Sequence, residues 1–105
     1  MNDVLGELAG ILEARKNSPP ASSYTATLYA GGIDAILKKI GEEAAELIIA
    51  AKAGEKDAII HETADVWFHT LVLLAHAELA PEDVLAELER RLGRSGLEEK
   101  AARPK

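Results

Sequence analysis

The segment that most restricts the possible folds is residues 57–79, because it carries apolar side chains on nearly every side of a helix. These apolar residues are Ile59, Ile60, Ala64, Val66, Trp67, Phe68, Leu71, Val72, Leu73, Leu74 and Ala75. A helix of this kind is stable only when neighbours cover several of its sides. A chain of 105 residues has few other segments for that purpose. We therefore expect a second subunit to cover the remainder, with Leu71 and Leu74 at the contact.

The rest of the chain also has the apolar periodicity of helices, and no segment alternates as a β-strand does. Asp3 is a candidate N-cap, and Gly54 a candidate C-cap. Helices are predicted over residues 3–16, about 33–53, about 57–79 and 81–92, with a short helical turn from Ser23 to Gly32. The expected fold is one all-α domain over residues 1–105, a bundle of about four to five helices completed by homodimerisation.

Two acidic motifs interrupt these apolar helices. Glu42-Glu43-x-x-Glu46 lies on one helix, and Glu62-x-x-Asp65 lies on the next. Acids three positions apart share a side of a helix, so four carboxylates can converge between the two helices. A helical projection puts Glu43 and Glu46 beside the apolar face and Glu42 opposite it. Carboxylates that converge repel one another unless a cation lies between them, and oxygen ligands suit Mg²⁺ or Mn²⁺.

The predicted metal ligands are therefore Glu43, Glu46, Glu62 and Asp65. Three histidines follow or flank the second motif. His69 is expected to orient a carboxylate as a neighbour of the metal ligands. His61 is predicted to project away from the acids onto the surface, and His76 is expected to have a structural role.

The charge and composition exclude several classes of function. A formal net charge of −6 argues against binding to nucleic acid or to an anionic membrane. Residues 1–17 lack the basic and long apolar regions of a signal peptide, and no apolar run is long enough to span a membrane. The absence of cysteine is compatible with a reducing compartment. A cytoplasmic location is expected.

Four motifs together resemble the phosphoribosyl-ATP pyrophosphatase family of histidine biosynthesis. They are Ser23-Tyr24-Thr25, Lys39-x-x-Glu42-Glu43-x-x-Glu46, Glu62-x-x-Asp65-x-x-x-His69 and Ser95-Gly96-Leu97-Glu98-Glu99-Lys100-x-x-Arg103. The resemblance covers about residues 23–103. The acidic motifs alone are shared by the wider all-α nucleotide pyrophosphohydrolases. The first and last motifs are the ones that resemble the phosphoribosyl-ATP pyrophosphatase family in particular. Trp67-Phe68 is a departure on the core side that affects no site residue.

The resemblance implies an all-α NTP pyrophosphohydrolase-like fold, a homodimer, and Mg²⁺-dependent hydrolysis of 1-(5-phosphoribosyl)-ATP to 1-(5-phosphoribosyl)-AMP and pyrophosphate. It implies phosphate contacts for Lys39, Lys100 and Arg103. Hydroxyl groups of Ser23 and Thr25, together with His69, complete the expected substrate-binding set.

The five acids, Glu42 included, form the expected catalytic set, in which Glu42 or Glu46 orients or deprotonates the attacking water. Two other functions are compatible with the same residues. One is a house-cleaning pyrophosphohydrolase that acts on a non-standard nucleotide, and the other is a helical dimerisation module without activity. The sequence leaves open the number of metal ions, the phosphorus attacked, and whether the C-terminal motif serves its own site or that of a partner.

Overall fold

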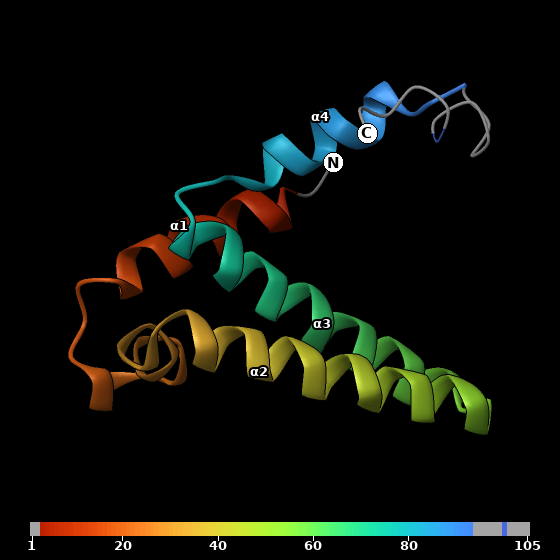
Figure 1. Cartoon of the computed structure of the whole chain (residues 1–105), viewed down its shortest axis with the longest axis horizontal. Coiled ribbons are helices and arrows are strands. Elements are labelled where there is room, and N and C mark those ends of the chain that lie inside the picture. The colour runs from red at the N-terminus through yellow and green to blue at the C-terminus, as the bar shows by residue number, and fades with distance from the viewer. Residues whose placement is uncertain (1–2, 94–99, 101–105) are drawn as a thin grey trace.

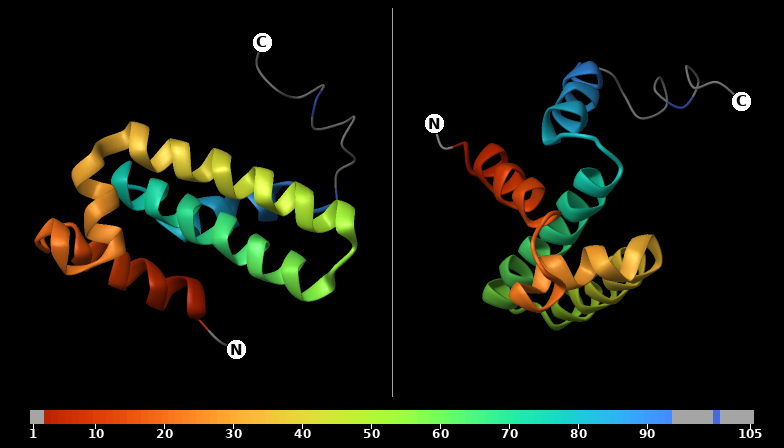
Figure 2. Two further views of the ribbon diagram at one scale, coloured as in Figure 1. Left: turned by 90° about the horizontal axis from the view of Figure 1, so that it is seen from below. Right: turned by 90° about the vertical axis from the view of Figure 1, so that its left-hand side faces the viewer.

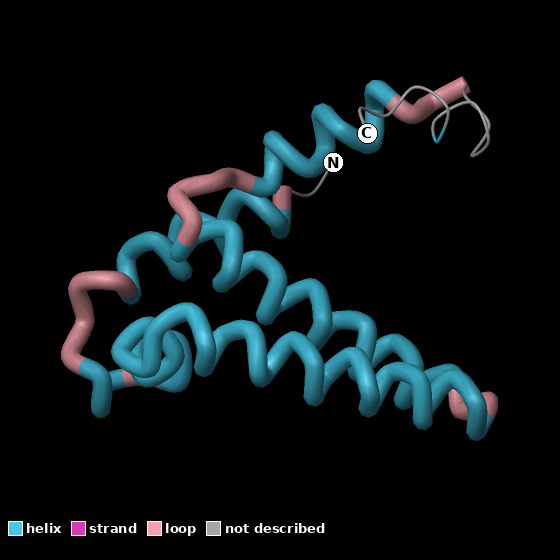
Figure 3. The backbone as a smooth tube through the Cα atoms, in the orientation of Figure 1, coloured by secondary structure: helices cyan, strands magenta, loops and turns pink. Residues whose placement is uncertain are grey.

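The computed structural model describes residues 3–93 and Lys100, and the regular structure in these residues is entirely helical. Its elements are α1 (Val4–Arg15), the short 3₁₀ helix η1 (Pro20–Ser22), α2 (Tyr24–Ala53), α3 (Lys56–His76) and α4 (Pro81–Arg90). Figure 3 shows the helices and the loops that join them. The predicted all-α class is confirmed. Among the described helices, none combines the length and the apolar character that crossing a membrane requires.

The ends of the helices follow the predicted signals. The Asp3 side chain accepts a hydrogen bond from the amide of Gly6 at 3.1 Å and caps α1. The left-handed Gly54, with a φ of 75°, ends α2. The third helix is shorter than predicted and ends at His76, because Glu78 adopts a φ of 62° and reverses the chain before Pro81. The helix was predicted to reach Leu79 because apolar residues continue to that position, beyond the point where the backbone turns.

Helices α2 and α3 form a long antiparallel hairpin that turns at Gly54 (Figure 1). Seen from below, the two helices run side by side over most of their lengths (Figure 2, left). Helix α1 packs against the carboxyl-terminal half of α3, and α4 lies beyond α1 on the same side of the hairpin. The acidic motifs thus lie on the two helices that pack most extensively.

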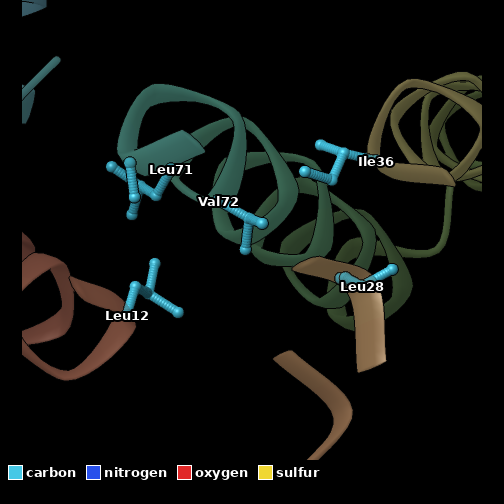
Figure 4. Packing of buried hydrophobic residues seen from close by; sticks show 6 residues of the cluster. Leu12, Leu28, Ile36, Leu71 and Val72 are labelled. Carbon is cyan, nitrogen blue, oxygen red and sulfur yellow. The ribbon is translucent and has the colours of Figure 1, made fainter. Parts of the chain in front are cut away.

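The core lies where α1 meets the hairpin. Leu12 of α1, Leu28 and Ile36 of α2, and Leu71 and Val72 of α3 are its buried centre (Figure 4). Leu71 is only 7% exposed within one protomer. Within the protomer, α1 packs on this side of α3 and covers most of Leu71, so Leu71 contributes to the core of the protomer itself.

Helix α2 is bent at Gly32. This residue has φ 78° and ψ −171°, a non-helical conformation that divides the helix near the predicted boundary. Side chains with a Cβ strongly disfavour this region. If α2 were straight, Tyr24 would lie about 22 Å along the helix axis from Lys39, because an α-helix rises 1.5 Å per residue. The bend instead brings Tyr24 back to α3 beside His69.

We expect Gly32→Ala to destabilise the protein by about 1–3 kcal/mol, because alanine is strained at this φ and ψ although no atom obstructs its Cβ. Gly41→Ala is the matched control on the same helix, where φ is helical and the added Cβ meets nothing within 4 Å. It should stabilise the helix by about 0.5–1 kcal/mol. Urea unfolding at one fixed protein concentration measures both changes, and equal effects would contradict the role assigned to the bend.

Candidate active site

The antiparallel hairpin places the two acidic motifs at matching levels. Glu43 and Asp65 each lie eleven residues from Gly54, on opposite sides of the turn, and Glu46 and Glu62 each lie eight residues from it. Residues equally distant from the turn of an antiparallel helix pair stand opposite each other, since both helices rise 1.5 Å per residue. These four acids are called the carboxylate cluster below. The fold thus puts an acid of α2 and an acid of α3 at the same level along the hairpin at two successive turns, while only Glu62 and Asp65, together with His61, have ligand atoms within 4.8 Å of one another among the described residues.

The acids differ in their exposure. The Glu43 side chain is 15% exposed, and that of the adjacent Glu42 is 51% exposed. The predicted inward direction of Glu43 and outward direction of Glu42 are confirmed. Glu46 is exposed, so the prediction that it faces inward is wrong for this protomer. A step of three residues falls short of a full helical turn, and this shift moves Glu46 to the edge of the packed face.

Glu62 has an oxygen atom that lacks a partner. Its side chain is 18% exposed, yet Oε2 is buried and, among the described residues, finds no hydrogen-bond donor. A buried carboxylate oxygen without a donor is costly. A cation beside Oε2 would remove this cost, so the carboxylate cluster fits a hard divalent ion of the kind that oxygen ligands bind.

His61 lies beside the acids of α3, although it was predicted to project away from them. Its Nε2 is 3.3 Å from Oδ2 of Asp65 and 3.7 Å from Oε1 of Glu62. His61, Glu62 and Asp65 each offer a potential ligand atom, and these atoms lie within 4.8 Å of one another. The error arose because residues four apart share a helix face, so His61 reaches Asp65 across one turn. His61 is exposed, as expected, and so is His76.

Lys39 forms ion pairs with the two carboxylates that follow it on α2. Its Nζ is 3.4 Å from Glu42 and 3.6 Å from Glu43. The Tyr24 hydroxyl, which becomes negative on ionisation, raises the pKa of Lys39, and Glu42 and Glu43 raise it further against the opposing effect of desolvation. Lys39 therefore carries a positive charge at the edge of the carboxylate cluster.

Tyr24 and His69 form a polar contact that the sequence did not indicate. The Tyr24 hydroxyl is 2.8 Å from Nε2 of His69, and Nδ1 of His69 is 2.7 Å from the carbonyl oxygen of Asp65. His69 is only 4% exposed. Its neighbour in the motif, Phe68, stacks on the Tyr24 ring, with centroids 6.4 Å apart. The signal that could have identified Tyr24 was its place in the Ser-Tyr-Thr motif.

The Tyr24 hydroxyl lies within the electrostatic reach of both acidic motifs. Burial raises its pKa most, the positive charge of Lys39 lowers it, and the negative charges of Glu43, Asp65 and Glu42 raise it again. The net effect is a raised pKa, so the hydroxyl keeps its proton at neutral pH. Helix α2 thus contributes an uncharged hydroxyl as well as carboxylates.

The remaining predicted substrate-binding residues have different surroundings. The Ser23 hydroxyl accepts a hydrogen bond from the Ala26 amide at 3.0 Å and caps α2. Thr25 is 7% exposed. Lys100 is exposed, and Arg103, like most of the C-terminal motif, lies outside the described residues.

Comparison with known proteins identifies the family of the chain. A sequence profile described as phosphoribosyl-ATP pyrophosphohydrolase matches residues 5–92, which include the carboxylate cluster, Tyr24 and His69. The chain belongs to the phosphoribosyl-ATP pyrophosphohydrolase family. Membership extends over most of the fold, from α1 through α4.

Individual family members are similar over nearly their whole lengths. A protein of Methylococcus capsulatus named phosphoribosyl-ATP pyrophosphatase is 63% identical, with 96% of each chain covered. A protein of the same name from Bordetella avium is 61% identical over 97% of this chain and 90% of its own. A third, from Geobacter metallireducens, is 52% identical over 99% of this chain and 95% of its own.

Proposed function

We propose that this chain hydrolyses 1-(5-phosphoribosyl)-ATP to 1-(5-phosphoribosyl)-AMP and pyrophosphate in histidine biosynthesis, in the cytoplasm. Membership of the phosphoribosyl-ATP pyrophosphohydrolase family supports this substrate. The observation that carries the chemistry is the unpartnered Glu62 oxygen, on a residue whose potential ligand atom lies within 4.8 Å of one on Asp65. Carboxylates of this kind suit a reaction in which a cation and a polyphosphate are bound together.

The acids have separate proposed roles. Glu43, Glu46, Glu62 and Asp65 would hold Mg²⁺, with Mn²⁺ as the substitute. The ion would offset the charge of the triphosphate and increase the acidity of a water in the site. His61, which is 72% exposed in its side chain, would contact Asp65 rather than bind Mg²⁺, because this ion prefers oxygen ligands. Glu46 or Glu42, both exposed, would orient the attacking water or accept its proton.

The cations would bind the phosphates. Lys39 stands at the edge of the carboxylate cluster with its charge maintained. Lys100 and Arg103 would approach from the C-terminal motif and stabilise the negative charge that develops on the departing pyrophosphate. Ser23 and Thr25 are proposed to lie along the substrate, and His69 is proposed to contribute through its neighbours.

The proposed function is tested by pyrophosphate release with and without Mg²⁺. The chain should hydrolyse phosphoribosyl-ATP with kcat/KM about 100-fold above that for ATP and for non-standard nucleoside triphosphates. Chelation should abolish turnover, and phosphorus NMR should identify phosphoribosyl-AMP and pyrophosphate as the products. A preference for a non-standard nucleotide would assign a house-cleaning role instead. If no nucleotide yields pyrophosphate, the proposed enzymatic activity is refuted.

We also propose that the chain is a homodimer. An apolar groove of about 450 Å³ separates α3 from α4. Trp67 lines the groove from α3 and is 58% exposed, and Val84, Leu85 and Leu88 line it from α4 with 43–52% exposure. Four large apolar side chains exposed along one groove mark an association surface. A twofold dimer is the commonest way to close such a surface.

A further inference from the structure

The proton of the Tyr24 hydroxyl has a defined direction. Nδ1 of His69 lies 2.7 Å from the Asp65 carbonyl oxygen, which can only accept a hydrogen bond, so Nδ1 carries the ring proton. In the neutral imidazole Nε2 is then an acceptor. In that form of the ring, the Tyr24 hydroxyl, 2.8 Å from Nε2, donates its proton to His69.

Packing holds both rings in this arrangement. His69 is 4% exposed and meets the Tyr24 and Phe68 rings edge to face, with centroid distances of 5.7 and 5.2 Å. Tyr24 itself is 50% exposed. One side of the tyrosine is thus held against the buried His69 ring and the half-buried Phe68 ring, while half of Tyr24 remains exposed to solvent.

We propose that Tyr24 is a binding residue of the active site whose oxygen acts only as a hydrogen-bond acceptor, and that His69 is the positioning residue that imposes this role. The Tyr24 oxygen would receive an O–H group at the carboxylate cluster. The kinetic part of this inference rests on the proposed function, whereas the direction of the proton does not.

The direction of the proton limits what Tyr24 can bind. Phosphate oxygens are acceptors, so they would meet the lone pairs of the Tyr24 oxygen without a proton between them. An O–H group has the proton that this position lacks. Within the proposed reaction such a group comes from the attacking water or from a ribose hydroxyl of the substrate. Tyr24 thus differs from Lys39, which suits phosphate.

Tyr24→Phe removes the acceptor and keeps the ring. We expect kcat/KM to fall about tenfold, the effect of losing one hydrogen bond. A fall in kcat at unchanged KM would identify the attacking water as the bound group, and a rise in KM at unchanged kcat would identify a substrate hydroxyl. Values of kcat and KM that both stay within about twofold of the wild type would overturn the proposal.

Tyr29→Phe is the matched control. Tyr29 lies on the same part of α2, and its hydroxyl donates to the Leu12 carbonyl of α1 at 2.9 Å, so this tyrosine also joins two helices. The loss of either hydroxyl should lower thermal stability by a similar amount. Only Tyr24→Phe should alter kinetics. An equal kinetic loss in Tyr29→Phe would reduce Tyr24 to a structural contact.

Nitrogen NMR of the histidine rings, without substrate or metal, tests the proton direction independently. At mildly alkaline pH, His69 should show a protonated Nδ1 and an unprotonated Nε2, and Tyr24→Phe should shift the Nε2 signal. A protonated Nε2 in the wild type would overturn the proposal even if the enzyme is active. A wild-type protein that does not hydrolyse phosphoribosyl-ATP but has the expected tautomer would refute the proposed function alone.

Discussion

Glu62→Gln should reduce turnover of phosphoribosyl-ATP by about a hundredfold or more. The reason is that a bound cation supplies several kcal/mol of charge stabilisation, and each 1.4 kcal/mol corresponds to about a tenfold change in rate. The Oε2 atom of Glu62 is buried and has no hydrogen-bond partner within residues 3–93 and Lys100. A bound cation would therefore offset the desolvation cost of this oxygen. Steady-state kinetics over a range of Mg²⁺ concentrations measures the loss.

The same substitution should have the opposite effect on the metal-free protein. Removing a negative charge from the carboxylate cluster relieves repulsion, so the thermal midpoint without Mg²⁺ should stay level or rise. The increase in midpoint that Mg²⁺ gives to the wild type should shrink, because binding to the folded state stabilises it. A variant that unfolds at lower temperature without metal would indicate that Glu62 is structural.

Glu42→Gln and Glu43→Gln provide the matched comparison on α2. The two glutamates are adjacent, and both contact Lys39, but their side chains are 51% and 15% exposed. Glu43→Gln should resemble Glu62→Gln, whereas Glu42→Gln should be milder. Equal losses would show that exposure in the protomer does not rank these acids.

Trp67→Asp should convert the proposed dimer to a monomer. A large aromatic residue at the centre of an interface commonly contributes 2 kcal/mol or more, which corresponds to a rise of about thirtyfold in the dimer dissociation constant. A carboxylate at the same position adds a desolvation penalty. Sedimentation equilibrium measures the constant, and the wild-type thermal midpoint should rise with protein concentration.

Ile11→Asp is the control for this substitution. Ile11 is 52% exposed on α1, close to the 58% of Trp67, and it does not line the groove between α3 and α4. It should leave the dissociation constant unchanged. A wild-type chain that is monomeric at micromolar concentration would contradict the proposed dimer. A Trp67→Asp variant that remains dimeric would contradict the proposed interface. Leu71 is unsuitable for this test because it is buried in the protomer core.

The sequence by itself determined the features that depend on neighbours along the chain. Asp3 and Gly54 end their helices through hydrogen bonds and backbone angles within a few residues, so their roles were predictable. The inward direction of Glu43 followed from helical periodicity. The spacing of the acids and the motifs at either side of them indicated the family. Each of these is a local property of a helix or of a short motif.

Only the tertiary structure decided which side chains meet. The bend at Gly32 and the packing of α2 on α3 bring Tyr24 to His69, although the two residues lie 45 positions apart. Periodicity assigns a helix an apolar face but does not say which neighbour covers it. The sequence therefore did not show that α1 covers Leu71 within the protomer, and it placed Glu46 inside, where no neighbour in the described protomer covers it. Contacts between distant segments depend on how whole helices pack, which no local pattern encodes.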